Sequence, residues 1–102
     1  MVKLEFYVPL EYADRVKNAL FEAGAGKIGN YDRCSWETSG TGQFRPGATS
    51  NPAVGNKESL TKVEELKIEM VCREKYIKNV INALKETHPY ETPAYHYYSV
   101  KY

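Results

Sequence analysis

The stretch RVKNALFE at residues 15–22 returns as NVINALKE at residues 79–86, and this internal repeat decides the predicted fold. The shift is 64 positions, and it needs no gap on either side of the two stretches. Further identical pairs are Lys3/Lys67, Glu5/Glu69, Tyr12/Tyr76, Tyr31/Tyr95 and Ser35/Ser99. The repeat predicts two copies of one supersecondary unit, over residues 2–38 and 66–102, within a single domain that spans residues 1–102.

Each copy predicts a strand, a helix and a second strand. Apolar and polar residues alternate over residues 2–8 and 66–72, which is the period of a strand with one buried face. An apolar stripe at helical spacing follows each strand, and it ends at Gly24 in the first copy and at Pro89 in the second. The second strands are predicted from Tyr31 to about Thr38 and from Tyr95 to Tyr102. Two such units in tandem predict an α+β, ferredoxin-like βαββαβ sandwich, a four-stranded antiparallel sheet with two helices on one face.

The other face of this sheet is predicted to lack a helical cover. Strand parity assigns charged residues and tyrosines to it: Lys3, Glu5, Tyr7, Tyr31, Arg33, Lys67, Glu69, Val71, Tyr95 and Tyr97. Tyrosine buries a large ring and keeps a polar hydroxyl, so it is favoured at protein interfaces. We therefore expect a homo-oligomer built through this face, with Tyr7, Tyr31, Tyr95 and Tyr97 as its contact residues.

Two loops are predicted to meet at one end of the sheet. Residues 39–61 form a long connection rich in Gly and Pro, which we interpret as a hairpin extension followed by a tip. The turn THPYETP, residues 87–93, lies at the same end by topology. The candidate ligand-binding residues are Gly40, Gly42, Gln43, Phe44, Arg45, His88, Tyr90 and Glu91, because they offer backbone N–H groups, a cation, aromatic rings and proton-exchanging groups.

Turn chemistry alone is the alternative explanation for these loops. In that case His88 caps a helix end, and the prolines only stiffen the turn. The corresponding turn of the first copy, AGAGKIGN at residues 23–30, contains no His, Tyr or Glu. This contrast favours a binding site, because polar groups beyond the needs of a turn are what a ligand site adds.

Composition and spacing exclude several functions. The net charge of +1 gives no basic field for nucleic acid or an anionic membrane, and no apolar run is long enough to span a bilayer. Cys34 and Cys72 form no CxxC pair and fall on core positions, which favours free, buried thiols in the cytoplasm.

A structural zinc site is not predicted, because the spacing of Cys34, Cys72, His88 and His96 matches no zinc-binding pattern. A looser site for a divalent metal ion at His88 and Glu91 stays open, and this ion is the only cofactor to consider. No nucleophile–base pair is evident, so we assign no catalytic residue and do not expect an enzyme.

Four blocks of the sequence resemble a known family. GAGKIGNYDRCSW, GTGQFRPG, NPAVG and HPYETPAY are similar to the domain inserted into YqfO-type proteins of the Ngg-interacting-factor family, with Trp36 and Thr92 where Phe and Glu are commoner. The resemblance covers essentially the whole chain. It implies a PII/CutA-like fold, here as a stand-alone chain, and assembly into trimers through the sheets. The dinuclear metal centre of that family lies in flanking domains, so it implies no metal ligand here.

The PII likeness also implies where a ligand would bind. In PII proteins, loops that correspond to residues 39–61 and 87–93 bind a nucleotide at a subunit boundary, but neither loop of this chain has the PII sequence pattern. We therefore expect a non-enzymatic, oligomeric PII/CutA-like module that binds a small ligand, an ion or a partner protein at the end formed by these loops. The alternative is a metal-ion-handling protein in the CutA manner.

Overall fold

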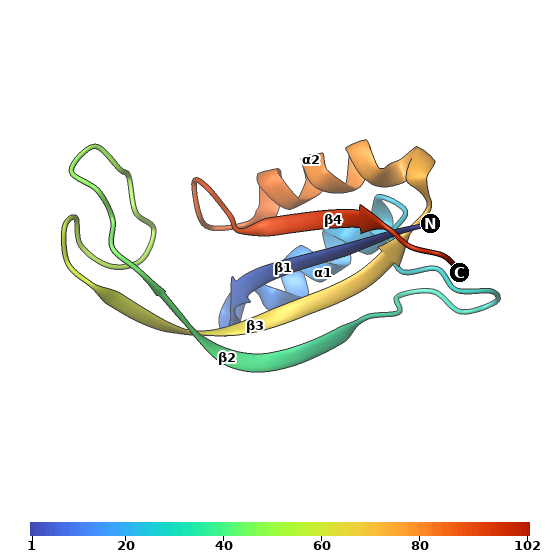
Figure 1. Ribbon diagram of the computed structural model, residues 1–102, viewed down its shortest axis with the longest axis horizontal. Helices are drawn as coiled ribbons and strands as arrows, with labels where there is room; N and C mark the ends of the chain where they lie inside the picture. Colours follow the sequence, from blue (N-terminus) through green and yellow to red (C-terminus); the bar gives the residue numbers. More distant parts are fainter.

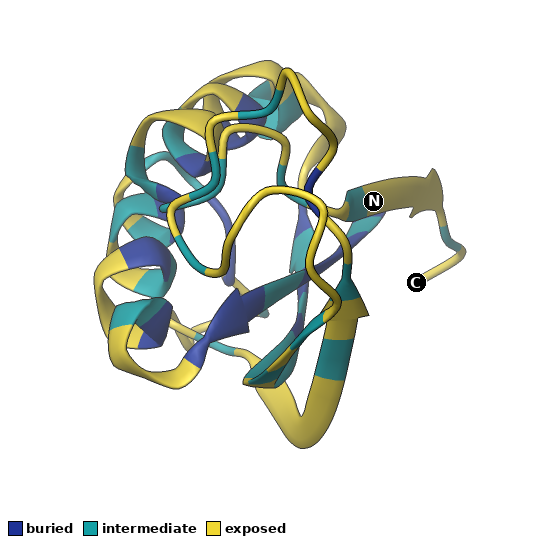
Figure 2. Ribbon diagram, turned by 90° about the vertical axis from the view of Figure 1, so that its left-hand side faces the viewer, coloured by how far each residue is buried: buried dark blue, intermediate teal, exposed yellow.

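A computed structural model describes residues 1–102 and shows a four-stranded sheet with two helices. The elements are β1 (Val2–Pro9), η1 (Leu10–Tyr12), α1 (Ala13–Glu22), β2 (Trp36–Phe44), β3 (Thr61–Cys72), η2 (Glu74–Tyr76), α2 (Ile77–Thr87) and β4 (Tyr95–Ser99). The strands lie in the order β2-β3-β1-β4, and every neighbouring pair is antiparallel. Both helices cover the same side of the sheet (Figures 1 and 2), so the predicted ferredoxin-like sandwich is confirmed. Neither helix has the length and apolar character needed to cross a membrane.

The hydrophobic core lies between this sheet and the two helices, as the dark blue residues of Figure 2 show. The alternation in β1 places Leu4, Phe6 and Val8 on the helix side, where each is fully buried. Their neighbours in the core include Ile68 and Met70 from β3, Val16 and Leu20 from α1, and Val80 and Leu84 from α2. Burial of a side chain of this size contributes roughly 1.5–3 kcal/mol. The apolar periodicity that predicted the elements is therefore also what holds the layers together.

The internal repeat survives as structure up to the ends of the helices. The pairs η1/η2 and α1/α2 each begin 64 residues apart. At the end of α1, Gly24 has a φ of +119°, and a Cβ there would lie 2.8 Å from Cγ of Tyr76. Glycine is required at this position because the first helix ends in contact with the second copy of the unit.

The two copies differ in their second strands. Residues 31–35, predicted as the start of a strand, form a turn instead, in which Ile28 bridges Tyr31 and the N–H of Cys34 donates to the carbonyl of Gly26. Arg33 has a φ of 53°, which an extended strand does not allow. Tyr31 and Arg33 therefore lie outside the sheet, and Cys34 is half-buried rather than a core residue.

β2 begins at Trp36 and continues to Phe44, so the connection to β3 comprises residues 45–60 rather than residues 39–61. Together β2 and β3 extend past the ends of β1 and β4 (Figure 1). This is the predicted hairpin extension, and its tip projects beyond the layered part of the molecule.

The assignment of Tyr95 and Tyr97 to the open sheet face was wrong. Tyr95 pairs with Phe6 and Tyr97 with Leu4, so both tyrosines lie on the helix side, and Tyr95 packs against the core. The register of β4 on β1, which the repeat does not fix, causes this difference. The open face carries instead Tyr7 and Lys67, which pair with each other, Trp36 opposite Glu69, His96 opposite Glu5 and Tyr98 opposite Lys3.

A charged network occupies the centre of the open face. Glu5 is only 8% exposed, and its carboxylate accepts hydrogen bonds from the Tyr98 hydroxyl at 2.6 Å and from Nε2 of His96 at 3.0 Å. Nζ of Lys67 lies 3.3 Å away. The hydrogen bond from Tyr98, with those from His96 and Lys67, lowers the pKa of Glu5 to about 2 against the cost of burial. Glu5 therefore keeps its negative charge, and the neighbouring side chains of the open face compensate that charge.

The two cysteines are expected to differ in reactivity. Cys72 is 2% exposed, and burial raises the pKa of its thiol, whereas Cys34 is half-buried on a turn outside the sheet. Labelling of the native protein with a thiol reagent should therefore modify Cys34 first and Cys72 only on unfolding, since the thiolate is the reactive form. Cys34→Ser should remove the fast phase. A fast phase that survives in Cys34→Ser and disappears in Cys72→Ser would contradict the placement of both thiols.

Candidate functional site

The connection at residues 45–60 and the segment at residues 88–94 meet at the hairpin end of the molecule. The backbone N–H of Asn51 donates to Oε1 of Glu91 at 2.9 Å, across 40 residues of sequence. The rings of Phe44 and Tyr90 lie edge to face with their centroids 5.7 Å apart. These contacts join β2, the long connection and the turn before β4 into one structural unit.

A cavity of about 330 Å³ lies between these segments. Its walls include five of the candidate residues, namely Gly42, Gln43, Phe44, Tyr90 and Glu91. The apolar part of the wall is completed by Pro46, Pro52, Ala53, Val54 and Ala94. A space of this size lies at the lower end of the range for small-molecule sites.

Sequence reasoning missed two further lining residues, Tyr7 and Glu65. Tyr7 was expected only at an oligomer face, and Glu65 is the residue that precedes the alternating stretch at 66–72. Glu65 could have been found from the pairing of β2 with β3, because the first residues of β3 pair with the extension of β2 that lines the cavity. Residues of β1, β2 and β3 therefore line the cavity together with residues of the two loops.

The side chain of Glu65 on β3 lies over Gly42 of the neighbouring strand β2 and lines the cavity. Its Oε2 accepts a hydrogen bond from the Tyr90 hydroxyl at 3.0 Å. A Cβ at position 42 would overlap Oε1 of Glu65, so Gly42 is required for this placement. Burial, and then the bond to Glu65, raise the pKa of Tyr90, so its hydroxyl keeps its proton and acts as the donor.

His88 lies behind the cavity rather than in it. The ring is buried, with 6% exposure; its Nε2 is 2.7 Å from the carbonyl oxygen of Tyr7, and its Nδ1 accepts the N–H of Tyr90 at 3.1 Å. These partners fix the neutral tautomer with the proton on Nε2. Burial lowers the pKa of His88. Since both ring nitrogens are engaged within the protein, the expectation that His88 contacts a ligand or a metal ion was wrong.

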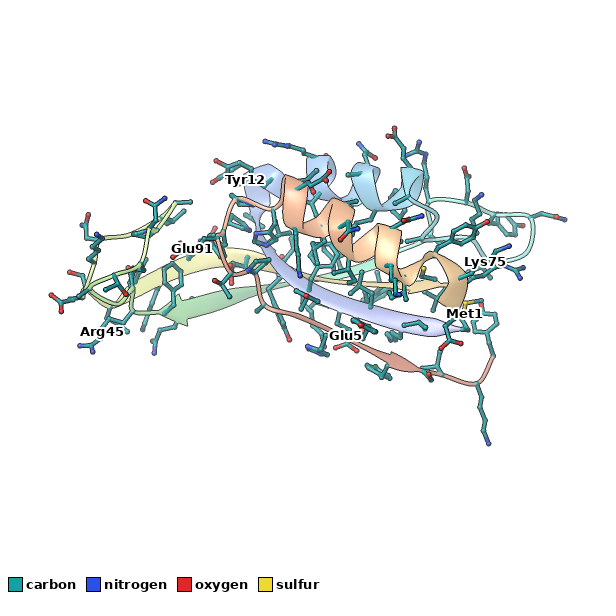
Figure 3. The ribbon with its side chains drawn as sticks, turned by 90° about the horizontal axis from the view of Figure 1, so that it is seen from above. Met1, Glu5, Tyr12, Arg45, Lys75 and Glu91 are labelled. Carbon is teal, nitrogen blue, oxygen red and sulfur yellow. The ribbon has the colours of Figure 1, made fainter.

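Gly40 and Arg45 also lie outside the cavity. Gly40 lines a separate hollow with Leu10 and Ser39, and Glu65 borders both this hollow and the cavity. Arg45 is exposed, and Figure 3 shows it near the far end of the hairpin, beyond Glu91. Both residues are close in sequence to lining residues, since Gly42, Phe44 and Pro46 do border the cavity.

The metal hypotheses find no geometric support. No group of three or more His, Cys, Asp or Glu side chains is arranged to hold a metal ion. Among the four residues considered from sequence, Cys72 is in the core, Cys34 is on the first turn, His88 is behind the cavity and His96 is bonded to Glu5 on the open face. The described site is therefore a cavity with aromatic walls and carboxylates.

Comparisons with known proteins agree with this fold. No protein-family model matches the chain. Proteins with the name GTP cyclohydrolase 1 type 2 homolog from Halalkalibacterium halodurans, Mycobacterium leprae and Bacillus subtilis are 45%, 44% and 42% identical to it, over 96%, 91% and 97% of this chain but 26%, 24% and 26% of their own. The chain is homologous to one segment of these larger proteins. It spans about a quarter of their length.

Solved structures show the same relationship. A Bacillus cereus protein related to NIF3 matches 99% of this chain and 26% of its own length, with 37% identity and a TM-score of 0.84. CutA1 from Pyrococcus horikoshii matches 98% of this chain and 83% of its own, with 18% identity and a TM-score of 0.70. The PII-like protein CutA from Nostoc matches 98% of this chain and 81% of its own, with 17% identity and a TM-score of 0.69. The resemblance to the PII/CutA-like domain of NIF3-related proteins is thereby confirmed, and the CutA structures share the fold.

His88 is expected to stabilise the fold in a pH-dependent way. Its pKa is lowered in the folded state, so the unfolded chain binds the proton more readily. The stabilisation is therefore complete above 6.5, the ordinary pKa of a histidine, and declines as the pH falls from 6.5 toward the lowered pKa of the folded state. Urea unfolding from pH 5 to 8 should show this decline in the wild type, and His88→Gln should lack it.

The same urea unfolding experiment measures how much the two hydrogen bonds of the His88 ring contribute to the free energy of unfolding. His88→Ala should cost about 2–3 kcal/mol, because it leaves a carbonyl and an N–H without partners. Glu91→Ala, at an exposed position of the same turn, is the matched control and should cost at most about 1 kcal/mol. Equal pH profiles for the wild type and His88→Gln would show that His88 does not titrate as described.

Proposed function

We propose that this chain is a non-enzymatic PII/CutA-like module that binds a small molecule in the cavity between residues 45–60 and 88–94. The observation that supports this is the cavity wall itself. Phe44 of β2, Glu65 of β3, and Tyr90 and Glu91 of the turn before β4 place aromatic rings and carboxylates around one space. A concave, mostly apolar space with a few polar groups is typical of a small-molecule site rather than of a protein-docking face.

Binding is favoured over catalysis by the position of the titratable groups. His88, the side chain best suited to proton transfer near neutral pH, is buried behind the wall with both nitrogens engaged. The name of the relatives refers to GTP cyclohydrolase, but this chain corresponds to about a quarter of them, so that activity is not assigned to it.

An organic ligand is favoured over a metal ion. The name of a CutA protein from Archaeoglobus fulgidus refers to divalent cation tolerance, and this protein shares only the fold with our chain, at 18% identity. The two metal ligands expected here were His88 and Glu91, and the imidazole of His88 has no free lone pair to offer.

We also propose a cytoplasmic location, which the two free cysteines support.

Blocking the cavity should abolish ligand binding. Ala53 lines the cavity, whereas Ala48 lies on the same connection and does not. In a thermal-shift screen of small metabolites, hits should stabilise the wild type and Ala48→Phe but not Ala53→Phe. A ligand at 100 times its Kd adds about 2.7 kcal/mol of stability. Hits that stabilise Ala53→Phe equally, or a screen without hits, would contradict a binding function for this cavity.

We further propose that the module works as a homo-oligomer through its open sheet face, with a trimer as the expected size. Trp36 is 69% exposed and Tyr98 45% exposed on this face. Tryptophan and tyrosine are the side chains most often found at the energetic centre of interfaces. The edge position of β2 also leaves one row of its backbone groups available for a partner strand.

Sedimentation equilibrium tests this proposal. The wild type should be oligomeric at micromolar concentration, and Trp36→Glu should shift it toward the monomer because the new charge would be buried in the interface. Leu60→Glu is the control, since Leu60 is 63% exposed on the long connection rather than on the open face. A monomeric wild type would overturn the proposal, and so would an unchanged assembly of Trp36→Glu.

A further inference from the structure

The walls of the cavity carry negative charge without any compensating cation. Among its 14 lining residues, Glu65 and Glu91 are carboxylates, and none is Lys, Arg or His. Neither glutamate takes part in a salt bridge. Arg45, which the sequence offered as an anion-binding group, lies outside the cavity. A phosphate or carboxylate ligand would therefore meet two like charges and no partner.

The carboxylate of Glu65 is held so that one oxygen remains available. Oε2 is occupied by the Tyr90 hydroxyl, and Oε1 accepts no hydrogen bond from the protein. No buried side-chain oxygen or nitrogen lacks a partner anywhere in the molecule, so Oε1 keeps access to solvent. The absence of a side chain at Gly42 provides the room for this oxygen. Tyr90 thus holds the carboxylate of Glu65, which lines the cavity, without neutralising its charge.

Aromatic rings stand beside this acceptor. Phe44 and Tyr90 are arranged edge to face, and the side chain of Tyr7 also lines the cavity. Aromatic faces attract cations and stack on flat rings. Carboxylates accept strong, charge-assisted hydrogen bonds from N–H groups that carry positive charge. The two features select for the same kind of ligand.

We propose that the cavity binds a planar aromatic cation, a ring compound whose protonated amine or amidine group donates N–H bonds to Glu65 and Glu91. The ring packs against Phe44 and Tyr90, and the cationic group points to Oε1 of Glu65. The volume of about 330 Å³ suits one or two fused rings without a phosphate chain. This proposal rests on the binding function proposed above and specifies the chemical class of its ligand.

Two probes of matching shape and opposite charge test the ligand class. Benzamidine carries a planar amidinium group, and benzoate carries a carboxylate on the same ring. NMR titration of the full chain should show that benzamidine shifts the resonances of Phe44, Tyr90 and Glu65, whereas benzoate and ADP do not. Glu65→Gln should weaken benzamidine binding about tenfold, since it removes a charged acceptor and keeps the size of the side chain. Glu64→Gln, the neighbouring residue outside this cavity, should leave the affinity unchanged.

The outcomes separate this proposal from the one on which it rests. If benzoate or ADP binds more tightly than benzamidine and Ala53→Phe abolishes that binding, the cavity is a ligand site and the cationic class is wrong. If benzamidine causes no shift at about 10 mM, far above the Kd of a useful fragment, the cationic class is also wrong. The metabolite screen with Ala53→Phe then decides the binding function independently. Should Glu65→Gln fail to fold, Glu91→Gln takes its place, and an unchanged affinity for benzamidine in that variant would overturn the role of the carboxylates.

Discussion

One buried imidazole positions most of the candidate site. The ring of His88 joins the backbone carbonyl of Tyr7 on β1 to the backbone N–H of Tyr90 in the following turn. The backbone N–H of His88 donates to the carbonyl of Leu84 and closes the last turn of α2. With Tyr90 fixed, its hydroxyl reaches Glu65 and its ring meets Phe44. A turn without such a bridge would need Pro89 alone to orient these groups. The imidazole therefore belongs to the support of the cavity, and it acts on a ligand only through the residues that it holds.

The internal repeat explains why the cavity lies at this end. The two copies agree from the first strand to the end of the helix, where the first copy uses Gly24 and the second uses His88 and Pro89. After that point the first copy leads into the extended β2 and the second into the short β4. Common sequence thus builds the sandwich, and the segments that differ between copies supply most of the cavity wall.

The sequence was sufficient for the elements that a local pattern determines. Alternation identified β1 and β3, helical spacing identified α1 and α2, and the repeat then predicted the four-stranded antiparallel sheet with both helices on one face. It was insufficient where a long-range choice decides. Because Arg33 has a left-handed backbone conformation, β2 begins only at Trp36 and not at Tyr31. The register of β4 on β1 places Tyr95 on the helix side of the sheet. The site followed the same rule: Phe44 and Tyr90 could be found from topology, but the burial of His88 and the reach of Glu65 over Gly42 depend on tertiary packing.

Glu5 and Glu65 show how the same side chain serves different purposes in this fold. Glu5, on the open face, has three donors in Tyr98, His96 and Lys67, and its pKa is lowered to about 2, so its charge is satisfied within the protein. Glu65 has one donor, the Tyr90 hydroxyl, and no cation. A carboxylate with that few partners retains binding capacity, because each of its oxygens can accept more than one hydrogen bond. The distribution of donors therefore assigns the first glutamate to the stability of the sheet and leaves the second available to a ligand.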